Sequence, residues 1–375
     1  MGLASKLAAA QAQAGQAGAQ AYQPAQQQWQ QPASQQQWPQ PGYPQAQYPQ
    51  PQYPQPQYGQ PAYAPQGGQP GYPPQQPAYQ QPGFPPQYGA APPQQQATTE
   101  AVRNKLQQTV ATNKLQAFYP PAKLQQVIDK VSAVDFRQLA QRWNSPMEMI
   151  LDLCALSLYD IVIYADDSGS MKYTDNGERL EDLKVVVSKV AEVVTLFDDD
   201  GITIRYINSE AKGDNIRSAQ AASEFVLKRS DFEGGTPLGT SLEKKIVQPI
   251  LGAAIKKRSL QKPLLVITIT DGEPTFEAAD MIFKVIKGAK AMAAESPYGP
   301  GAIAFEFAQV GRDQQAQAFL AKLDNDPTVG AMVDATSYYE LEADECAKKG
   351  VTLSPELWLV KLMVGAIDPS YDAQD

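Results

Sequence analysis

The first 99 residues of the chain lack what a folded core needs. They contain a single charged side chain, Lys6, and 20 of the 32 prolines, and no valine, isoleucine or leucine follows Leu7 within them. Such a segment cannot bury enough apolar surface to offset the entropy lost on ordering. We therefore predict a disordered tail rich in Pro, Gln and Tyr over residues 1–99, with the folded part of the protein confined to the remaining chain.

Two uses of this tail, and one bland alternative, remain open from its composition. Tyrosine recurs at every fifth position from Tyr43 to Tyr63, in units close to PQPQY. The sequence Pro85-Pro86-Gln87-Tyr88 has the PPxY form of segments that dock into WW domains. Weak self-association is the second use, because the tail is almost without charge and combines Gln with Tyr. The alternative is a solvated spacer.

The overall composition excludes several classes of function. The chain has no histidine, which excludes Ser-His-Asp and Cys-His nucleophile pairs, HExxH zinc sites and Cys2His2 fingers. A net charge of -9 and a pI of about 4.8 argue against binding to the phosphates of nucleic acid. We expect no nucleic-acid partner.

The cysteines and the ends of the chain bear on its location. Cys154 and Cys346 form no CxxC pair and lie in apolar helical patterns, so we expect buried free thiols of an intracellular protein. No run reaches the 18 apolar residues that span a membrane, and the opening is too short and polar for a signal peptide. A cytoplasmic location follows. Membrane-surface attachment through Gly2 is a weaker prediction, because Lys6 stands where a myristoylation signal has Ser or Thr.

Helical periodicity begins with the return of charge at Glu100. A first helix should end before Pro120-Pro121, a second should start there, Asp135 can cap a third, and Ser145-Pro146 opens a fourth. We expect these segments to form a small helical module over residues 100–154.

From Tyr159 onward the pattern changes to strands alternating with helices, which predicts a doubly wound, Rossmann-like α/β domain with a mostly parallel central sheet. We place this domain at residues 155–345 and a C-terminal helix and tail at 346–375. The expected strands are 159–165, 202–207, 264–270, 303–310 and 332–334, and the expected helices are 180–197, 238–255, 278–294, 316–323 and 354–364.

A cation-binding pattern stands directly after the first expected strand. The sequence Asp166-Asp167-Ser168-Gly169-Ser170 contains D-x-S-x-S. In an extended turn residues two apart point the same way, so Asp166, Ser168 and Ser170 can direct three oxygens at one point. Oxygen ligands suit hard cations such as Mg²⁺, Mn²⁺ or Ca²⁺.

Two further segments end at the same edge of the expected sheet. Gly234-Gly235-Thr236 precedes a long helix, and the buried strand 264–270 is followed by Asp271. Five residues of these three segments resemble, in their order and context, the metal-ion-dependent adhesion site of von Willebrand factor type A (vWA) domains. They are Asp166, Ser168, Ser170, Thr236 and Asp271. The resemblance covers about residues 155–345.

The resemblance implies a binding protein without enzymatic activity. Family members usually hold Mg²⁺ through the two serines, the threonine and, through water, the aspartates. An Asp or Glu side chain of a protein partner completes the coordination. One departure from the family's motif is Asp167, at a position that is often Gly. In the loop 172–178, carboxylates suit either a neighbouring Ca²⁺ site or turn and cap roles.

Three functions follow from these patterns. The first is a metal-dependent protein-binding adaptor whose tail recruits or clusters partners. The second is a scaffold driven by the tail, through WW docking or condensation, with the folded domain as a passive platform. The third is a hydrolase, because Asp166-Asp167 after a strand superficially resembles phosphatases with an aspartyl nucleophile. Those enzymes need a carboxylate where Ser168 stands, which disfavours catalysis.

Overall fold

A single six-stranded sheet forms the centre of the protein. The computed structural model describes residues 2–16, 93–229 and 231–371. The strand order is β3-β2-β1-β4-β5-β6, and every neighbouring pair is parallel except β2 and β3. The strands are β1 (Asp160–Ala165), β2 (Ile202–Tyr206), β3 (Lys212–Ile216), β4 (Leu264–Thr270), β5 (Ile303–Gln309) and β6 (Val333–Thr336).

The central strands are apolar because both of their faces are covered. All residues of β4 and β5 are buried, and in β1 only Asp160 is partly exposed. Strands buried on two faces need continuous apolar runs in place of alternation. The mixed α/β architecture and the mostly parallel sheet predicted from the sequence are therefore confirmed.

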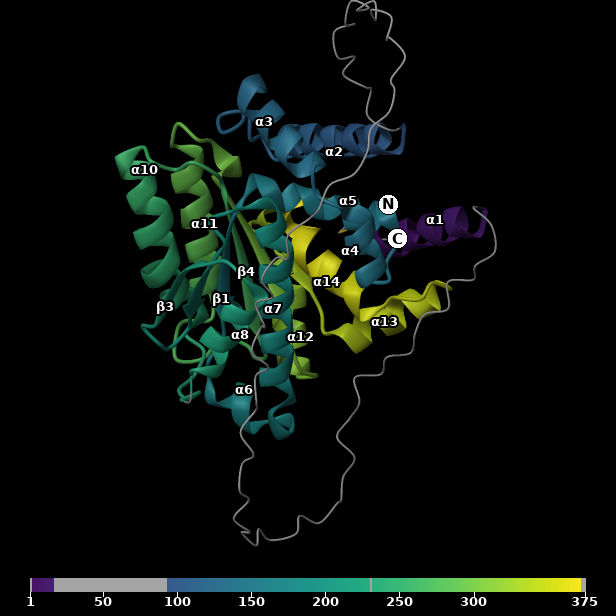
Figure 1. Cartoon of the computed structure of the whole chain (residues 1–375). Coiled ribbons are helices and arrows are strands. Elements are labelled where there is room, and N and C mark those ends of the chain that lie inside the picture. Colours follow the sequence, from purple (N-terminus) through teal and green to yellow (C-terminus); the bar gives the residue numbers. More distant parts are fainter. Residues whose placement is uncertain (1, 17–92, 230, 372–375) are drawn as a thin grey trace, which may run out of the picture. The chain divides into compact units, whose positions relative to one another are not determined.

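The helices cover both faces of this sheet (Figure 1), with α10 and α11 on one side and α7 and α14 on the other. The α-helices are α1 (Leu3–Gln16), α2 (Pro93–Thr112), α3 (Pro121–Ser132), α4 (Phe136–Arg142), α5 (Met147–Asp152), α6 (Gly169–Tyr173), α7 (Glu178–Phe197), α8 (Ala219–Leu227), α9 (Leu238–Leu242), α10 (Ala253–Lys257), α11 (Met281–Ala294), α12 (Gln314–Asp324), α13 (Tyr339–Lys348) and α14 (Pro355–Val364).

Three parts of the α/β region differ from the sequence prediction. The expected helix 238–255 is divided into α9, a π-helix over Glu243–Gly252, and α10. Pro249 lies inside the π-helix and cannot donate a backbone hydrogen bond. The sequence pattern does not predict the edge strand β3, because the strand is polar and only two of its five residues are buried. Helices α8 and α13 were also missed.

The local start and stop signals between residues 100 and 154 are confirmed. Pro121 is the first residue of α3, and the Asp135 carboxylate accepts a hydrogen bond from the Gln138 amide at 3.0 Å at the start of α4. Side chains of these helices, such as Leu106 and Trp143, belong to the same buried core as the sheet. Residues 93–152 therefore pack as part of the main compact unit.

The N-terminal residues correct the predicted tail boundaries. Residues 3–16 form α1, and α2 already begins at Pro93, so both ends of the predicted disordered segment are helical. Leu3 and Leu7 are buried at 6% and 0% exposure, and Gly2 is buried beside them. One face of Leu and Ala was enough to dock α1, because the rest of the folded chain supplies the apolar surface. The motif residues Pro85, Pro86 and Tyr88 lie outside the described residues.

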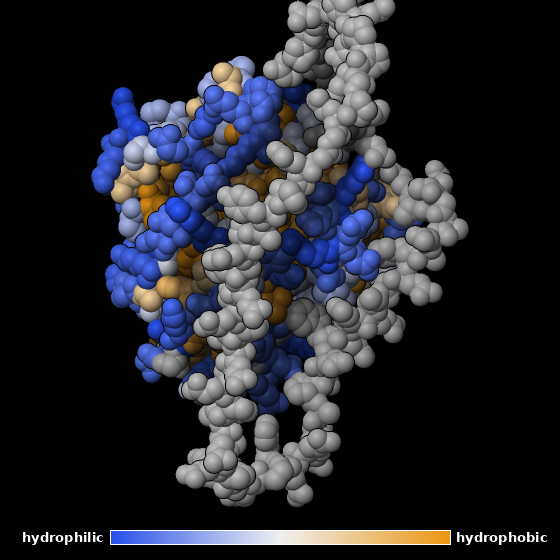
Figure 2. Space-filling view, viewed as in Figure 1, coloured by the Kyte–Doolittle hydropathy of each residue, from blue (hydrophilic) through white to orange (hydrophobic). Residues whose placement is uncertain are grey.

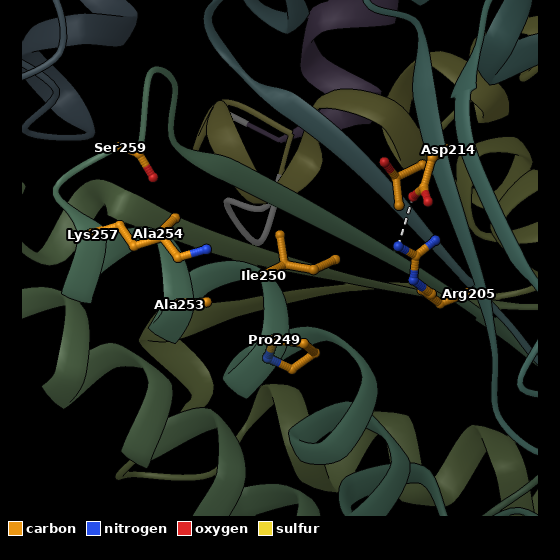
Figure 3. Close-up of a pocket in the computed structure, with 9 residues that line it drawn as sticks. Arg205, Asp214, Pro249, Ile250, Ala253, Ala254, Lys257 and Ser259 are labelled. Atoms are coloured by element: carbon orange, nitrogen blue, oxygen red, sulfur yellow. Dashed lines mark hydrogen bonds and ion pairs between the residues drawn. The ribbon is translucent and has the colours of Figure 1, made fainter.

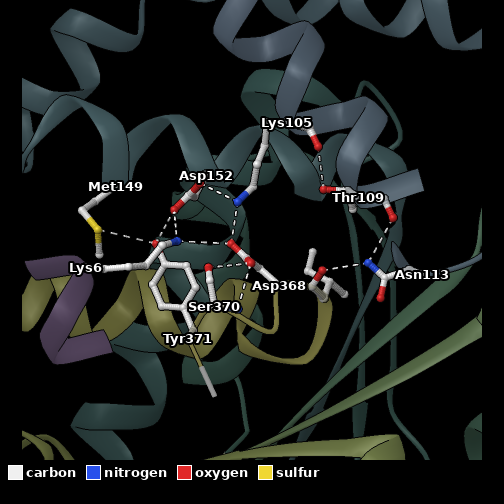
Figure 4. Close-up of polar contacts among 10 residues, drawn as sticks. Lys6, Lys105, Thr109, Asn113, Met149, Asp152, Asp368, Ser370 and Tyr371 are labelled. Carbon is white, nitrogen blue, oxygen red and sulfur yellow. Dashed lines mark hydrogen bonds and ion pairs between the residues drawn. The ribbon is translucent and has the colours of Figure 1, made fainter. Parts of the chain in front are cut away.

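Four charged side chains hold α1, α2 and the C-terminal segment together (Figure 4). The Nζ atoms of Lys6 and Lys105 both lie between the carboxylates of Asp152 and Asp368, at 2.5 to 3.3 Å. The Tyr371 hydroxyl donates to Asp152 at 2.7 Å, and its ring lies 3.8 Å from Lys6 Nζ. We call Lys6, Lys105, Asp152 and Asp368 the clasp, since two lysines from separate helices share the same two carboxylates.

The exterior of the described part is mainly polar. Figure 2 shows hydrophilic residues over most of the visible face, with apolar residues in small patches. Among the described residues, no helix combines the length and apolar character needed to cross a bilayer. Cys154 and Cys346 are buried free thiols, as predicted.

Candidate functional site

The predicted cation ligands lie where the sheet order reverses. Strands β1 and β4 are neighbours, yet the chain continues from β1 to β2 on one side and from β4 to β5 on the other. At such a switch point the loops that follow the two strands diverge and leave a crevice at the carboxyl edge, the usual ligand position in open α/β sheets. Asp166 follows β1 directly and Asp271 follows β4.

Asp166 is fully buried and held by two hydrogen bonds. Its Oδ1 accepts from the Ser168 amide at 2.8 Å, and its Oδ2 accepts from the Thr270 hydroxyl at 2.7 Å. Burial raises the pKa of this carboxyl to about 7, and the nearby Asp271 adds to the rise. Burial and the neighbouring carboxyl thus disfavour the ionised form of Asp166.

The two serines connect this carboxylate to the second one. Ser168 Oγ lies 3.0 Å from Ser170 Oγ, which in turn lies 3.0 Å from Asp271 Oδ1. Ser168 is the N-cap residue of α6 and Ser170 is in its first turn. The short helix thus directs both hydroxyls toward the end of β4, and four of the five predicted ligands form one continuous polar group.

Arg179 is an additional member of the site that the sequence did not identify. Its Nη1 lies 2.7 Å from Asp271 Oδ2, and its Nε lies 2.7 Å from Asp175 Oδ2. Asp271 is fully buried, and burial raises its pKa while Arg179 opposes the rise. Asp175 therefore serves Arg179 in this structure, which favours the structural role of the 172–178 loop over the second Ca²⁺ site.

The helix position of Arg179 gives only a weak signal of its role. The residue lies in the first turn of α7, where the helix dipole disfavours a positive charge. Its charge is compensated by Asp175, four residues earlier, and by Asp271, which follows β4 and is 92 residues further along the chain.

Thr236 lies on the adjacent loop and is not hydrogen-bonded to the other four ligands among the described residues. It is buried at 5% exposure. Its amide donates to Thr275 Oγ1 at 2.7 Å, and its carbonyl accepts from the Thr275 amide at 2.9 Å. Two backbone hydrogen bonds join this loop to the segment of Asp166 and α6: Gly169 N donates to Gly234 O at 3.3 Å, and Glu233 N donates to Asp167 O at 3.0 Å.

Asp167 organises the loop after β2. It is fully buried, and its carboxylate accepts from the amides of Asn208 and Ser209 at 2.7 and 3.0 Å and lies 2.7 Å from Arg229 Nε. Lys245 holds the same loop from the π-helix, because its Nζ lies 2.7 to 3.1 Å from four successive carbonyl oxygens over residues 206–209. The charge of Asp167 is thus already compensated within the fold.

A second buried carboxyl pair lies away from this site. Glu306 on β5 and Asp334 on β6 are register partners, and Thr336 Oγ1 donates to Glu306 Oε1 at 2.8 Å. Burial, and then Asp334, raise the pKa of Glu306 well above its usual range. A Cβ at Gly365 would lie 1.9 Å from Asp334 Oδ2, so glycine is needed where the C-terminal segment covers the pair.

A separate cavity of about 320 Å³ lies between β2 and the π-helix (Figure 3). Thr203 of β2 and Ser259, which precedes β4, are among the residues that line it. Arg205 and Asp214 lie side by side on one wall of this cavity, with Nη2 and Oδ1 2.6 Å apart. The ion pair neutralises the arginine of the lining, and none of the lining residues is a candidate ligand.

Comparison with known proteins does not assign a family. No family model matches the chain, and no curated protein sequence matches it either. Among solved structures, proximal thread matrix protein 1 from the mussel byssus aligns over 57% of this chain with 16% identity and a TM-score of 0.33. This chain covers 48% of that protein.

The donor set of the site suits a hard divalent cation. All of its donors are oxygen atoms, which such cations prefer. They belong to two buried carboxylates, to two hydroxyls that each lie 3.0 Å from another donor of the site, and to a third hydroxyl on the next loop. Within the described residues, no cluster of three or more Asp, Glu, Cys or His side chains is arranged to hold a metal. A cation at this edge would thus depend on Ser168, Ser170 and Thr236 as much as on Asp166 and Asp271.

Proposed function

We propose that the protein is a metal-dependent protein-binding adaptor of the vWA type. Asp166, Ser168, Ser170, Thr236 and Asp271 would hold the cation, with Mg²⁺ favoured over Mn²⁺ or Ca²⁺. The observation that carries the proposal is the continuous polar group from Asp166 to Asp271 at the switch point of the sheet. A bound cation would supply Lewis acidity toward a carboxylate of a protein partner.

The charges of the site support binding at this position. Asp166 and Asp271 are fully buried, and within 4 Å Arg179 is the one basic side chain among the described residues that pairs with either of them. Buried carboxylates without full compensation are costly. The raised pKa of Asp166, caused first by burial and then by Asp271, has the same origin. A divalent cation would compensate the remaining charge and stabilise the folded state.

Thermal unfolding of the full chain tests the proposal directly. At a free Mg²⁺ concentration 100 times Kd, a single site stabilises by about 2.7 kcal/mol, which corresponds to a rise in Tm of several degrees. The rise should be present in Mg²⁺ or Mn²⁺, reversed by EDTA, and lost in Asp166→Ala and Ser170→Ala. Glu273→Gln is the matched control, because Glu273 follows Asp271 by two residues and is exposed.

The test has a clear negative outcome. If neither cation shifts the Tm of the wild type, the metal-dependent function is wrong. If the shift persists unchanged in Asp166→Ala, the cation binds elsewhere and the proposed ligand set is wrong.

The alternative function, with the same fold, is a scaffold that acts through its tail. Its WW-binding motif at Pro85, Pro86 and Tyr88 lies outside the described residues, so the alternative rests on the sequence. Removal of residues 27–82 leaves α1, α2 and this motif in place, and Tyr88→Ala removes the motif separately. Partner capture that needs Mg²⁺ and survives both changes supports the adaptor; capture that is lost in either change, with or without Mg²⁺, supports the scaffold.

A further inference from the structure

Two aromatic side chains stand exposed beside the candidate cation site. Tyr173 ends α6 and is 72% exposed, and Phe276 lies in the loop after β4 and is 88% exposed. Among the described residues, Leu196 and Leu227 are the remaining large apolar side chains with comparable exposure, at 37% and 57%. Tyr173 lies three positions after Ser170, and Phe276 lies five positions after Asp271. Each aromatic residue therefore follows a motif segment of the site.

Each of the two rings lies against a glycine, and the two glycines belong to neighbouring segments of the site. A Cβ at Gly235 would lie 2.0 Å from Phe276 Cδ2, so this ring rests on the glycine. The Tyr173 ring approaches Gly169, where a Cβ would lie 3.9 Å from Cδ2. Because Gly169 N donates to the carbonyl of Gly234 at 3.3 Å, the two rings flank one connected loop surface that also carries Ser168, Ser170 and Thr236.

The loop holds Phe276 outward in an unfavourable backbone conformation. Its φ is +59°, which is rare for a bulky residue and is retained only where the surroundings impose it. The residues on both sides impose it here. Thr275 exchanges two hydrogen bonds with Thr236, and the Glu277 carboxylate accepts from the Gly239 and Thr240 amides at 2.8 Å at the start of α9.

Lys172 Nζ lies 5.3 Å from the centre of the Tyr173 ring, but three exposed residues next to the motif segments in sequence are acidic. Glu178, Glu233 and Glu273 follow or precede the motif segments and are exposed. Arg179, the basic residue closest to the ligands in sequence after Lys172, is buried and paired. These glutamates would repel a partner carboxylate unless the cation compensates it, and they favour basic side chains on the rest of the partner.

We propose that Tyr173 and Phe276 form an apolar rim that selects the partner of the cation site. The partner fitting this surface is a protein segment with one Asp or Glu, an apolar side chain next to it, and Lys or Arg further out. The inference rests on the proposed function, since the acidic residue is the one that would meet the cation. Exposed aromatic residues fixed in place commonly carry much of the affinity at interfaces.

A peptide-display selection on the full chain tests this rim. A random 12-residue library is bound in Mn²⁺ and eluted with EDTA, and the recovered peptides are measured by fluorescence anisotropy. We expect them to share an acidic residue with an apolar neighbour. Binding should weaken about tenfold in Tyr173→Ser and in Phe276→Asn, the expected loss when one buried aromatic contact is removed. Asn is chosen because it tolerates a positive φ.

Leu196→Ser is the matched control. Leu196 is also an exposed apolar residue, but it lies near the C-terminal end of α7, whereas the site faces the N-terminal end. This variant should bind the peptides as the wild type does. Stabilisation by Mn²⁺ is measured in all variants to separate cation binding from partner binding.

Two outcomes overturn the inference in different ways. If Mn²⁺ stabilises the protein but the peptides show no apolar preference, are absent, or bind the rim variants unchanged, the rim is wrong while the cation site stands. If Mn²⁺ does not stabilise the wild type, the proposed function fails together with the inference.

Discussion

At the scale of single residues, Arg179 decides the charge state of the candidate site. It provides one positive charge against the two buried carboxylates of Asp166 and Asp271. Its guanidinium contacts Asp271 Oδ2, while the hydroxyl of Ser170 contacts Oδ1. Arg179 and a divalent cation would therefore compensate the same carboxylate, one from the side of α7 and the other from the side of the serines.

Replacement of Arg179 by Met tests this sharing. In EDTA the free energy of unfolding should fall by about 3 kcal/mol, because Asp271 is left buried without its ion pair. Mg²⁺ should then stabilise Arg179→Met more than the wild type, since it compensates more unpaired charge. Urea unfolding of both proteins, with and without Mg²⁺, measures the difference.

Arg312→Met is the control for the loss of an arginine. Arg312 pairs with Glu340 at 2.7 Å, but both side chains are more than half exposed, so the change should cost little. Equal stabilisation by Mg²⁺ in the wild type and Arg179→Met would show that Arg179 and the cation do not share Asp271.

At the scale of elements, α1 depends on groups from three other segments. Lys6 contacts Asp152 at the end of α5 and Asp368 after α14, and Lys105 of α2 contacts the same pair. Burial by itself raises the pKa of Asp368, but Lys105 and Lys6 outweigh it and lower the pKa to about 2. The ionised form of Asp368 is thus favoured in the folded protein.

This lowered pKa predicts a stability that depends on acid pH. The carboxyl releases its proton more readily in the folded than in the unfolded state, so its contribution is present above about pH 4 and is lost as the pH falls toward 2. The wild type should exceed Asp368→Asn by about 2 kcal/mol near pH 5, and the difference should vanish near pH 2. Urea unfolding across this range measures it; a constant difference would contradict the assigned ion pairs.

At the scale of the whole molecule, the docking of α1 changes the topology of the predicted tail. Helices α1 and α2 join in the same clasp, so residues 17–92 connect two segments that both belong to the folded unit. The long segment is a closed connection whose two ends are fixed, in contrast to the free N-terminal tail that composition alone predicts.

Shortening this connection should stabilise the protein. Removal of residues 27–82 leaves about 20 residues between the helices, and the lower entropy of closing a shorter loop is worth about 1 kcal/mol. Removal of residues 1–99 should instead destabilise it, because Leu3, Leu7 and Lys6 no longer cover the core and the clasp. Thermal unfolding of both deletions decides; if the second deletion is as stable as the wild type, α1 does not contribute to the fold.

Much of the α/β order could be predicted because it depends on local pattern. The buried runs of β1, β4 and β5, the proline start of α3 and the Asp135 cap are each read from a few adjacent residues. The same holds for Asp166, Ser168 and Ser170, whose spacing within one turn brings their oxygens together.

The remaining features depend on residues far apart in the chain. Arg179 is recognised as part of the site only when α7 is placed beside β4, and α1 becomes a core element only when its Leu face meets the folded chain. The exposure of Phe276 follows from hydrogen bonds made by its neighbours to another loop. Sequence by itself determined the α/β class and the candidate ligands, because short-range periodicity and spacing encode them; long-range packing and charge pairing, which no local pattern encodes, decided the rest.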